Sequence, residues 1–455
     1  MSGDRAQAHA APGAWPTSED DSRAHIKLNK ILLLTFNYTA KLSGGVGAHV
    51  QELAHGLKRS GCQVIVLTHS TGETAIVDDG GVQVHYVGAS RRTLSQTAQL
   101  SIAQNMLAFN QDLIDYAQPL LAHDPQKPDL VHYHHWFTFA AARQIGAAFN
   151  LPILGTLHYL THPIEQWWGE TPNPSVAQQE NIWLQNAQQL ITVSESMRQL
   201  VETFYPTTIG KLHVIRNSIN LDVFWKTQLS AQARSQLRAT IAKSGERIVL
   251  FAGRINPMKG LEPLIDSAAL VREQYPNVRY VIIGAPDSRD YLSKVQAQVR
   301  RSPGLEASVT FLGRLDRRQL ALLYQVADVA VFPSIYEPLG MVAVEAMLSG
   351  VPPIVSDVGG LAEVVLAERT GLHVPVHTDA SELHRVDVPA LAAAQLRLLR
   401  DESLRQALGQ AAFDYVRNEL SFERTTLRPT MAVYRQVIHN HQVRAEHPPM
   451  VEAQP

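Results

Sequence analysis

The 455-residue chain has a single cysteine, Cys62. One thiol cannot form an intramolecular disulfide, which excludes a disulfide-stabilised scaffold and favours a reducing cytoplasm as the location. Cys62 follows Ser60 and Gly61 at the start of an apolar segment, so a buried and unreactive thiol is expected.

Long apolar runs are also missing. No uncharged run reaches the ~18–20 residues of a membrane-spanning helix, and the N-terminus lacks the apolar centre of a secretory signal. The formal net charge is −2, so no strong field favours nucleic acid or an anionic membrane. We therefore expect no nucleic-acid partner and no membrane association. The sequence leaves the oligomeric state open.

Short apolar runs alternate with helical patterns along the chain, in two successive series. The runs predicted as strands are residues 30–36, 63–68, 82–87, 130–134, 152–157, 190–193 and 212–215, then 248–252, 278–283, 309–312, 329–332 and 353–356. Continuous apolar strands separated by helices are typical of parallel sheets. The sequence therefore predicts an α/β protein with two Rossmann-like doubly wound domains facing across a cleft.

The expected organisation follows from these series. Polar residues 216–222 mark the boundary between the two domains. The predicted units are a disordered tail over 1–27, an N-terminal acceptor domain over 28–222, a C-terminal donor domain over 223–424, a helix returning to the N-terminal domain over 425–440, and a disordered tail over 441–455.

The strongest motif follows the strand that ends at Phe332. Pro338 suits the first turn of a helix, so the next four amides are expected at a helix N-terminus, unpaired and facing the cleft. These amides belong to Leu339, Gly340, Met341 and Val342. Such a helix start is suited to binding a diphosphate.

Two carboxylates flank this helix start. With wholly helical spacing, the Cα atoms of Glu337 and Glu345 would lie roughly 12 Å apart. One carboxylate can then accept hydrogen bonds from sugar hydroxyls and the other from a ribose. The alternative is a capping carboxylate plus an ordinary helix glutamate, which the apolar surroundings of Glu345 disfavour.

The Glu-x7-Glu pattern, followed by Val355-Ser-Asp-Val-Gly-Gly-Leu-Ala-Glu363, resembles the large retaining glycosyltransferase family that contains sucrose and glycogen synthases. This is family four, with the GT-B fold. The resemblance covers most of the chain between about Lys30 and Tyr434. It implies a UDP-, ADP- or GDP-linked sugar donor and a small-molecule or glycan acceptor.

A second loop, 251–260, carries Gly253, Arg254 and Lys259. The planar fork of Arg254 can bridge phosphate oxygens, and Lys259 adds a compact charge. The resemblance implies that both cations neutralise the donor diphosphate during departure. A solvated cationic loop is the alternative. No Asp-x-Asp occurs in the chain; we therefore expect no metal requirement and no cofactor.

Glycines and histidines complete the candidate set. Gly44 and Gly45 lie in an expected loop after the first strand, where a plain tight turn is an equal alternative. The resemblance places Gly45 near the donor, Gly44 and His134 near the acceptor, and His158 beside the reacting sugar. Tyr159 belongs to an aromatic group that is expected to line the acceptor site or simply to pack. A metal site built from paired histidines is a weaker alternative, because no matching cysteine or carboxylate spacing accompanies them.

The resemblance implies a same-face substitution, in which the leaving phosphate helps to deprotonate the acceptor. Catalysis would then depend on positioning and on stabilising the departing diphosphate, through His158, Arg254, Lys259 and Glu337. A non-catalytic sugar-binding protein, a nucleotide-sugar epimerase and a glycan phosphorylase remain alternatives. The Ser218 replacement of a family glycine leaves the role of the interdomain segment open.

Overall fold

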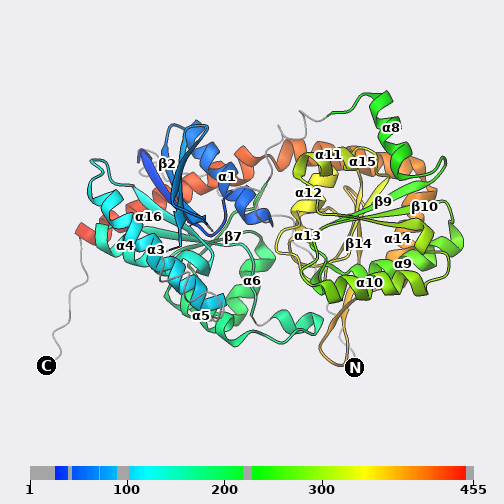
Figure 1. Ribbon diagram of the computed structural model, residues 1–455, viewed down its shortest axis with the longest axis horizontal. Coiled ribbons are helices and arrows are strands. Elements are labelled where there is room, and N and C mark those ends of the chain that lie inside the picture. The colour runs from blue at the N-terminus through cyan, green and yellow to red at the C-terminus, as the bar shows by residue number, and fades with distance from the viewer. Residues whose placement is uncertain are drawn as a thin grey trace, which may run out of the picture.

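The computed structural model describes residues 26–38, 44–70, 72–89, 102–162, 164–218 and 228–446. Two parallel sheets form separate lobes, which confirms the predicted α/β class with two Rossmann-like units (Figure 1). The boundary proposed at the end of 216–222 lies mostly outside the described residues, as do 1–25 and 447–455.

The first lobe is built on an eight-stranded sheet with the order β3-β4-β2-β1-β5-β6-β7-β8. All pairs are parallel except the edge pair of β3 with β4. The strands are β1 Lys30–Thr35, β2 Gln63–Ser70, β3 Ala75–Asp79, β4 Val82–Gly88, β5 Leu130–His134, β6 Ile153–Leu157, β7 Leu190–Thr192 and β8 Leu212–Val214. The sequence did not predict β3.

Helices cover both faces of this sheet, and alternate residues of β1 serve the two sides. Leu32 and Leu34 belong to the hydrophobic cluster with α3 and α4, whereas Ile31 and Leu33 pack with α1 and α16. The helices are α1 Gly44–Arg59, α3 Ile102–Ala122, α4 Phe139–Phe149, α5 Pro174–Asn186 and α6 Glu195–Phe204, with short turns η1 Trp136–Thr138, η2 Ile164–Trp168 and η3 Pro206–Thr208.

The second lobe has a six-stranded sheet with the order β11-β10-β9-β12-β13-β14 and a separate hairpin, β15-β16. Its strands are β9 Arg247–Ala252, β10 Val278–Ile283, β11 Val309–Gly313, β12 Val329–Phe332, β13 Pro353–Ser356, β14 Leu372–Val374, β15 Val376–Thr378 and β16 His384–Val386. Its helices are α8 Ala231–Ile241, η4 Pro257–Lys259, α9 Leu261–Gln274, α10 Arg289–Arg301, η5 Glu306–Ser308, α11 Arg317–Tyr324, α12 Met341–Leu348, α13 Gly359–Val364, α14 Val388–Arg400 and α15 Glu402–Glu419.

The chain then crosses back to the first lobe through η6 Glu423–Leu427 and α16 Arg428–Glu446 (Figure 1). Tyr434 and Val437 of α16 pack in the hydrophobic cluster of β1. The helix runs six residues into the segment predicted as a disordered tail from 441, and His441 contacts the backbone carbonyl of Asn150 at 3.1 Å. The predicted helix ended too early because the prediction used the composition of the segment, and composition does not show this tertiary contact.

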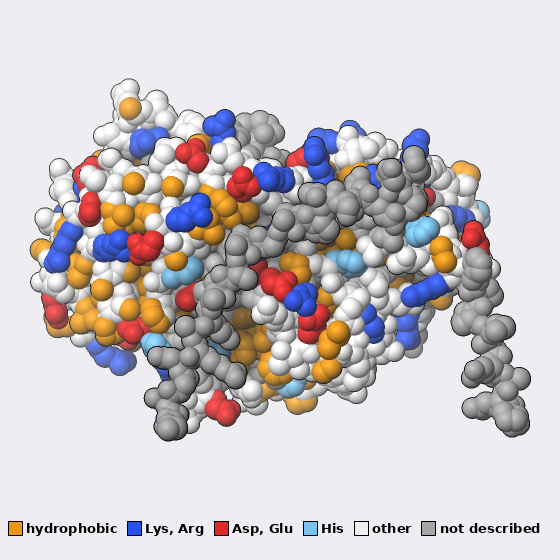
Figure 2. Space-filling view, turned by 180° about the vertical axis from the view of Figure 1, so that it is seen from behind, with side chains coloured by type: hydrophobic (Ala, Val, Ile, Leu, Met, Phe, Trp, Pro, Cys, Tyr) orange, Lys and Arg blue, Asp and Glu red, His pale blue; other side chains and the backbone are white. Residues whose placement is uncertain are grey.

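In the described part of the chain, no helix is long and apolar enough to cross a membrane. Acidic and basic side chains are interspersed over the coloured part of the face in Figure 2. This mixed pattern agrees with the expectation that no single-sign surface field arises from the near-zero net charge.

Candidate active site

Two loops of the second lobe meet at the carboxyl ends of β9 and β12. Gly260 has φ 68°, and a Cβ added there would lie 1.8 Å from the carbonyl oxygen of Pro333. Only glycine therefore permits the two backbones to approach this closely. The amide of Ile335 also donates to the carbonyl of Met258 at 2.8 Å. The loops carrying Lys259 and Glu337 are thus held as one unit.

Lys259 and Glu337 form an ion pair across this junction. The Lys259 Nζ lies 2.6 Å from the Glu337 Oε2, and each side chain is 14% exposed. Asn256 supports the lysine by accepting the Lys259 amide at 3.2 Å. The sequence placed Glu337 only as a partner for sugar hydroxyls and missed this pair, because the two residues are 78 positions apart.

Arg254 lies at the outer edge of the same loop. Its Nη1 is 3.1 Å from the Asp287 Oδ2, and its side chain is 61% exposed. The guanidinium charge lowers the pKa of Tyr159, although burial and Glu180 raise that pKa more strongly. The charge of Arg254 thus reaches an aromatic residue of the first lobe. Gly253, which precedes it, donates its amide to the carbonyl of Ile283 at 3.0 Å.

The helix start of α12 differs from the prediction. The helix begins at Met341 with Gly340 as its N-cap at φ 91°, so Pro338 and Leu339 lie in the preceding turn rather than in the first helical turn. The left-handed glycine sets the entry of the chain into the helix. The Gly360 amide donates to the Glu337 carbonyl at 2.8 Å, which packs the Gly-Gly segment beneath this turn. Glu337 lies against this helix start, because a Cβ added at Gly340 would lie 3.6 Å from the Glu337 Cγ, and Glu337 in turn pairs with Lys259.

Glu345 is buried within α12 and is 8% exposed. Its Oε1 lies 3.4 Å from the Arg317 Nε, while the Arg317 Nη1 lies 2.6 Å from the Glu52 Oε1 of α1. Burial raises the pKa of Glu345, and Arg317 opposes that rise. The carboxylate assigned to a ribose is thus already paired with an arginine that bridges both lobes, which local sequence patterns do not reveal. Beside it, the Val342 carbonyl accepts a hydrogen bond from the Tyr324 hydroxyl at 3.1 Å.

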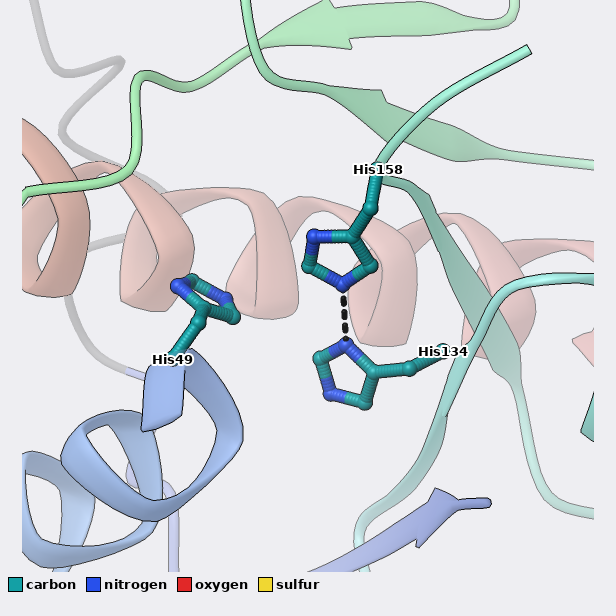
Figure 3. Close-up of side chains that lie close together, drawn as sticks. All are labelled: His49, His134 and His158. Carbon is teal, nitrogen blue, oxygen red and sulfur yellow. Dashed lines mark hydrogen bonds between the residues drawn. The ribbon is translucent and has the colours of Figure 1, made fainter. Parts of the chain in front are cut away.

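In the first lobe, histidines gather at the carboxyl ends of β5 and β6. The His134 Nδ1 lies 3.0 Å from the His158 Nε2, and the His49 ring of α1 tips toward them (Figure 3). On its other side, the His158 Nδ1 lies 3.5 Å from the Asn217 Nδ2. Both ring nitrogens of His158 thus face protein atoms. The structure brings together the predicted His134 and His158 and adds His49 and Asn217, which the sequence missed.

These three imidazoles lie close enough together to be considered as metal ligands. Ring nitrogens of His49, His134 and His158 lie within 4.8 Å of one another, and burial lowers all three pKa values, to about 4 for His49. The buried His49 Nδ1 and His134 Nε2 have no hydrogen-bond partner among the described residues. Burial thus favours neutral imidazoles, which is also the form that binds a metal, so the expectation of a metal-free enzyme stays a prediction. We refer to the three side chains as the histidine network.

Gly44 and Gly45 begin α1 itself, so the structure corrects the expectation that both lie in a loop. A Cβ added at Gly45 would meet no atom within 4 Å among the described residues. Gly45 is therefore notable for the open space beside it and not for a backbone conformation that requires glycine. Tyr159 directly follows His158, and its carbonyl accepts from the His135 Nε2 at 3.0 Å.

The lobes also contact each other away from these loops. The Glu363 carboxylate accepts hydrogen bonds from the amides of Glu195 and Ser196 at 3.1 and 2.6 Å, and it pairs with Arg216 at 3.1 Å. The Ser218 hydroxyl, at the replaced family glycine, donates to the Leu420 carbonyl. Arg216 and Ser218 of the polar interdomain segment therefore have defined partners, although the sequence assigned them none.

Comparisons with known proteins agree with this arrangement. The family described as Glycosyltransferase Family 4 matches residues 43–223, and Glycosyl transferases group 1 matches residues 233–415. An uncharacterized glycosyltransferase of Methanocaldococcus jannaschii is 33% identical over 348 residues, which cover 76% of this chain and 85% of the relative.

Solved structures show the same fold. Sucrose-phosphate synthase from Thermosynechococcus elongatus superposes with a TM-score of 0.75 at 26% identity, covering 90% of this chain and all of that chain. An Anabaena protein solved in complex with UDP and glucose gives a TM-score of 0.63 at 19% identity, covering 91% and 99%. The chain therefore belongs to the family-four glycosyltransferases of the GT-B fold.

Proposed function

We propose that this glycosyltransferase transfers a hexosyl group from a nucleotide-diphosphate sugar to a small-molecule or glycan acceptor, with retention and without a metal. The observation that carries the proposal is the convergence of Lys259 with the start of α12 at the carboxyl edge of the second sheet. A cation beside unpaired helix amides suits a diphosphate. The similarity to a protein solved with UDP and glucose supports a nucleotide-sugar donor.

Each side of the cleft has a distinct part in this proposal. Arg254 and Lys259 stabilise the departing diphosphate, and Glu337 both orients Lys259 and accepts hydrogen bonds from the transferred sugar. Glu345, fixed by Arg317, accepts from the ribose. On the first lobe, His158 and His134 hold the side of the sugar where the acceptor arrives.

The reaction forms a bond between an acceptor hydroxyl oxygen and the anomeric carbon while the bond from that carbon to the phosphate oxygen breaks. The hydroxyl proton passes to the leaving phosphate on the same face. Charge develops on the diphosphate as it departs, and fixed donors there lower the barrier. Closure of the two lobes excludes water, which would otherwise hydrolyse the donor.

The test is a screen of UDP-, ADP- and GDP-sugars against mixed acceptors in EDTA, with products identified by mass spectrometry and NMR. The proposal expects a glycosylated product that keeps the anomeric configuration of the donor. An inverted product refutes retention, and loss of activity in EDTA refutes metal independence. Nucleotide release without transfer to any acceptor favours the non-catalytic or hydrolytic alternatives, and an isomerised donor favours an epimerase.

A further inference from the structure

A fully buried carboxyl group on α5 contacts the segment that follows His158. Glu180 of α5 is 0% exposed. Its oxygens accept the amide of Thr161 at 3.1 and 3.2 Å and the amide of His162 at 2.8 Å. No lysine or arginine in the described ranges forms an ion pair with it. Backbone amides, together with the Thr161 side chain, are thus the donors around this carboxyl group.

The segment that Glu180 holds carries the acceptor side of the cleft. Residues 158–162 follow β6 and begin with His158, which contacts His134. The Leu160 amide donates to the Tyr336 hydroxyl of the second lobe at 3.4 Å. Tyr336 immediately precedes Glu337. The segment therefore links the histidine network to the donor loop within a few residues.

Burial without a cation favours the neutral carboxylic acid, because the charged form would be costly here. The oxygens of the acid still accept hydrogen bonds from the fixed donors of residues 161 and 162. A short segment tied at both ends by defined hydrogen bonds is held to a narrow range of positions. Such precision matters in an active site, where a displacement of about 1 Å can lower the reaction rate about 100-fold.

We propose that Glu180 is a positioning residue for glycosyl transfer: its carboxyl group holds residues 158–162 so that His158 faces the reacting sugar and the Leu160 amide meets Tyr336. This inference rests on the proposed function. Glu180 touches neither substrate nor reacting atoms, so it acts through the segment that it anchors.

The first test measures the anchor without using activity. In Glu180→Leu, the acceptor of the Thr161 and His162 amides is lost; in Glu180→Gln, the side-chain carbonyl can still accept from both. Hydrogen exchange on the full chain should show amides 160–162 exchanging at least about tenfold faster in Glu180→Leu, with most protection restored in Glu180→Gln. Gln395→Leu, a buried polar change in α14 of the other lobe, controls for global destabilisation.

The second test separates donor binding from transfer. With UDP as the probe, calorimetry should give equal affinity in wild type and Glu180→Leu, because UDP lacks the sugar that His158 faces and the diphosphate loops lie in the other lobe. Transfer by Glu180→Leu to the acceptor found in the donor screen should fall about 10- to 100-fold in kcat/KM, with Glu180→Gln recovering most of it.

Unchanged exchange at 160–162, or an equal loss of transfer in Gln395→Leu of matched stability, would overturn the role of Glu180. A wild-type protein without any transfer activity would refute the proposed function instead. The exchange result then still decides whether Glu180 anchors the segment.

Discussion

The Nζ of Lys259 and the Oε2 of Glu337 lie 2.6 Å apart, joining the loops that follow β9 and β12. The pair is mostly buried, with each side chain 14% exposed. It fixes a cation beside the start of α12 while one of the three ammonium donors is occupied. The other N–H groups of the ammonium remain as donors for a diphosphate that enters the space between the lobes.

Replacing Lys259 by alanine should lower kcat by about 10²- to 10³-fold, because a fixed donor to the leaving group is lost. Turnover should fall far more than stability, but the melting temperature should also fall, because Glu337 is left mostly buried without its cation; kinetics are therefore measured well below the melting temperature of the variant. Lys294→Ala, which removes an exposed ion pair with Glu262 in the same lobe, is the matched control and should keep wild-type turnover. Wild-type kinetics in a folded Lys259→Ala protein would count against the assigned role.

Truncating His158 to alanine should reduce transfer about 10- to 100-fold, because the ring that positions the sugar is lost. The measurement is steady-state transfer by the folded variant. His377→Ala serves as the control, since His377 is exposed on β15 with a side chain 65% exposed. Unchanged turnover in His158→Ala would contradict the assignment.

Arg317 separates two carboxylates, Glu52 and Glu345, and its removal leaves Glu345 buried without a cation. Arg317→Met should therefore lower the free energy of unfolding by about 2 kcal/mol, less than for a fully buried pair because Arg317 keeps 21% exposure. Adding Glu345→Gln should recover part of that loss in urea denaturation. Equal stability of Arg317→Met and wild type would show that the bridge contributes nothing.

The free energy of unfolding should vary with pH in part through the ionisation of Glu180. Burial raises its pKa to about 8, against the amides of His162 and Thr161, which lower it. Because the protonated form is favoured in the fold, its contribution to stability is fully present below the ordinary glutamate pKa. That contribution is lost as pH rises through about 8.

The charged and titratable neighbours of Glu180 are Glu165 of η2, Tyr159, Tyr205 and Tyr336 of the second lobe. The pKa values of the three tyrosines are raised by burial, so they stay neutral in this range. Urea denaturation at pH 6 and pH 8.5 should therefore show a smaller loss of stability in Glu180→Gln than in wild type. Identical losses in the two proteins would refute this account.

The fold was readable from the sequence because its central strands are short, continuous apolar runs such as Ile31 to Leu34, buried on both faces. The short strands β14, β15 and β16 were missed; β15 and β16 form a polar, partly exposed hairpin without the apolar run that marked equally short strands such as β7. The start of α12 was misplaced by three residues: Pro338 suggested the first turn, but Gly340 adopts the left-handed conformation that begins the helix.

The sequence indicated which residues are candidates for the site, but not which side chains they pair with. Arg254, Lys259, Glu337 and Glu345 stood out because loops after parallel strands share one edge of the sheet. Their partners Asp287 and Arg317, and the anchor Glu180, lie in helices or loops whose spacing carries no local signal. Such contacts depend on how elements pack, which no sequence window contains.

The most direct test of the central claim is calorimetric titration of UDP, ADP and GDP in EDTA into wild type and Lys259→Ala. The account predicts that at least one nucleotide diphosphate binds the wild type without a metal. Its affinity should fall about tenfold or more in Lys259→Ala, because a charge-assisted contact to phosphate is lost. Equal affinity in both proteins, or binding that appears only when a divalent cation is added, would contradict it.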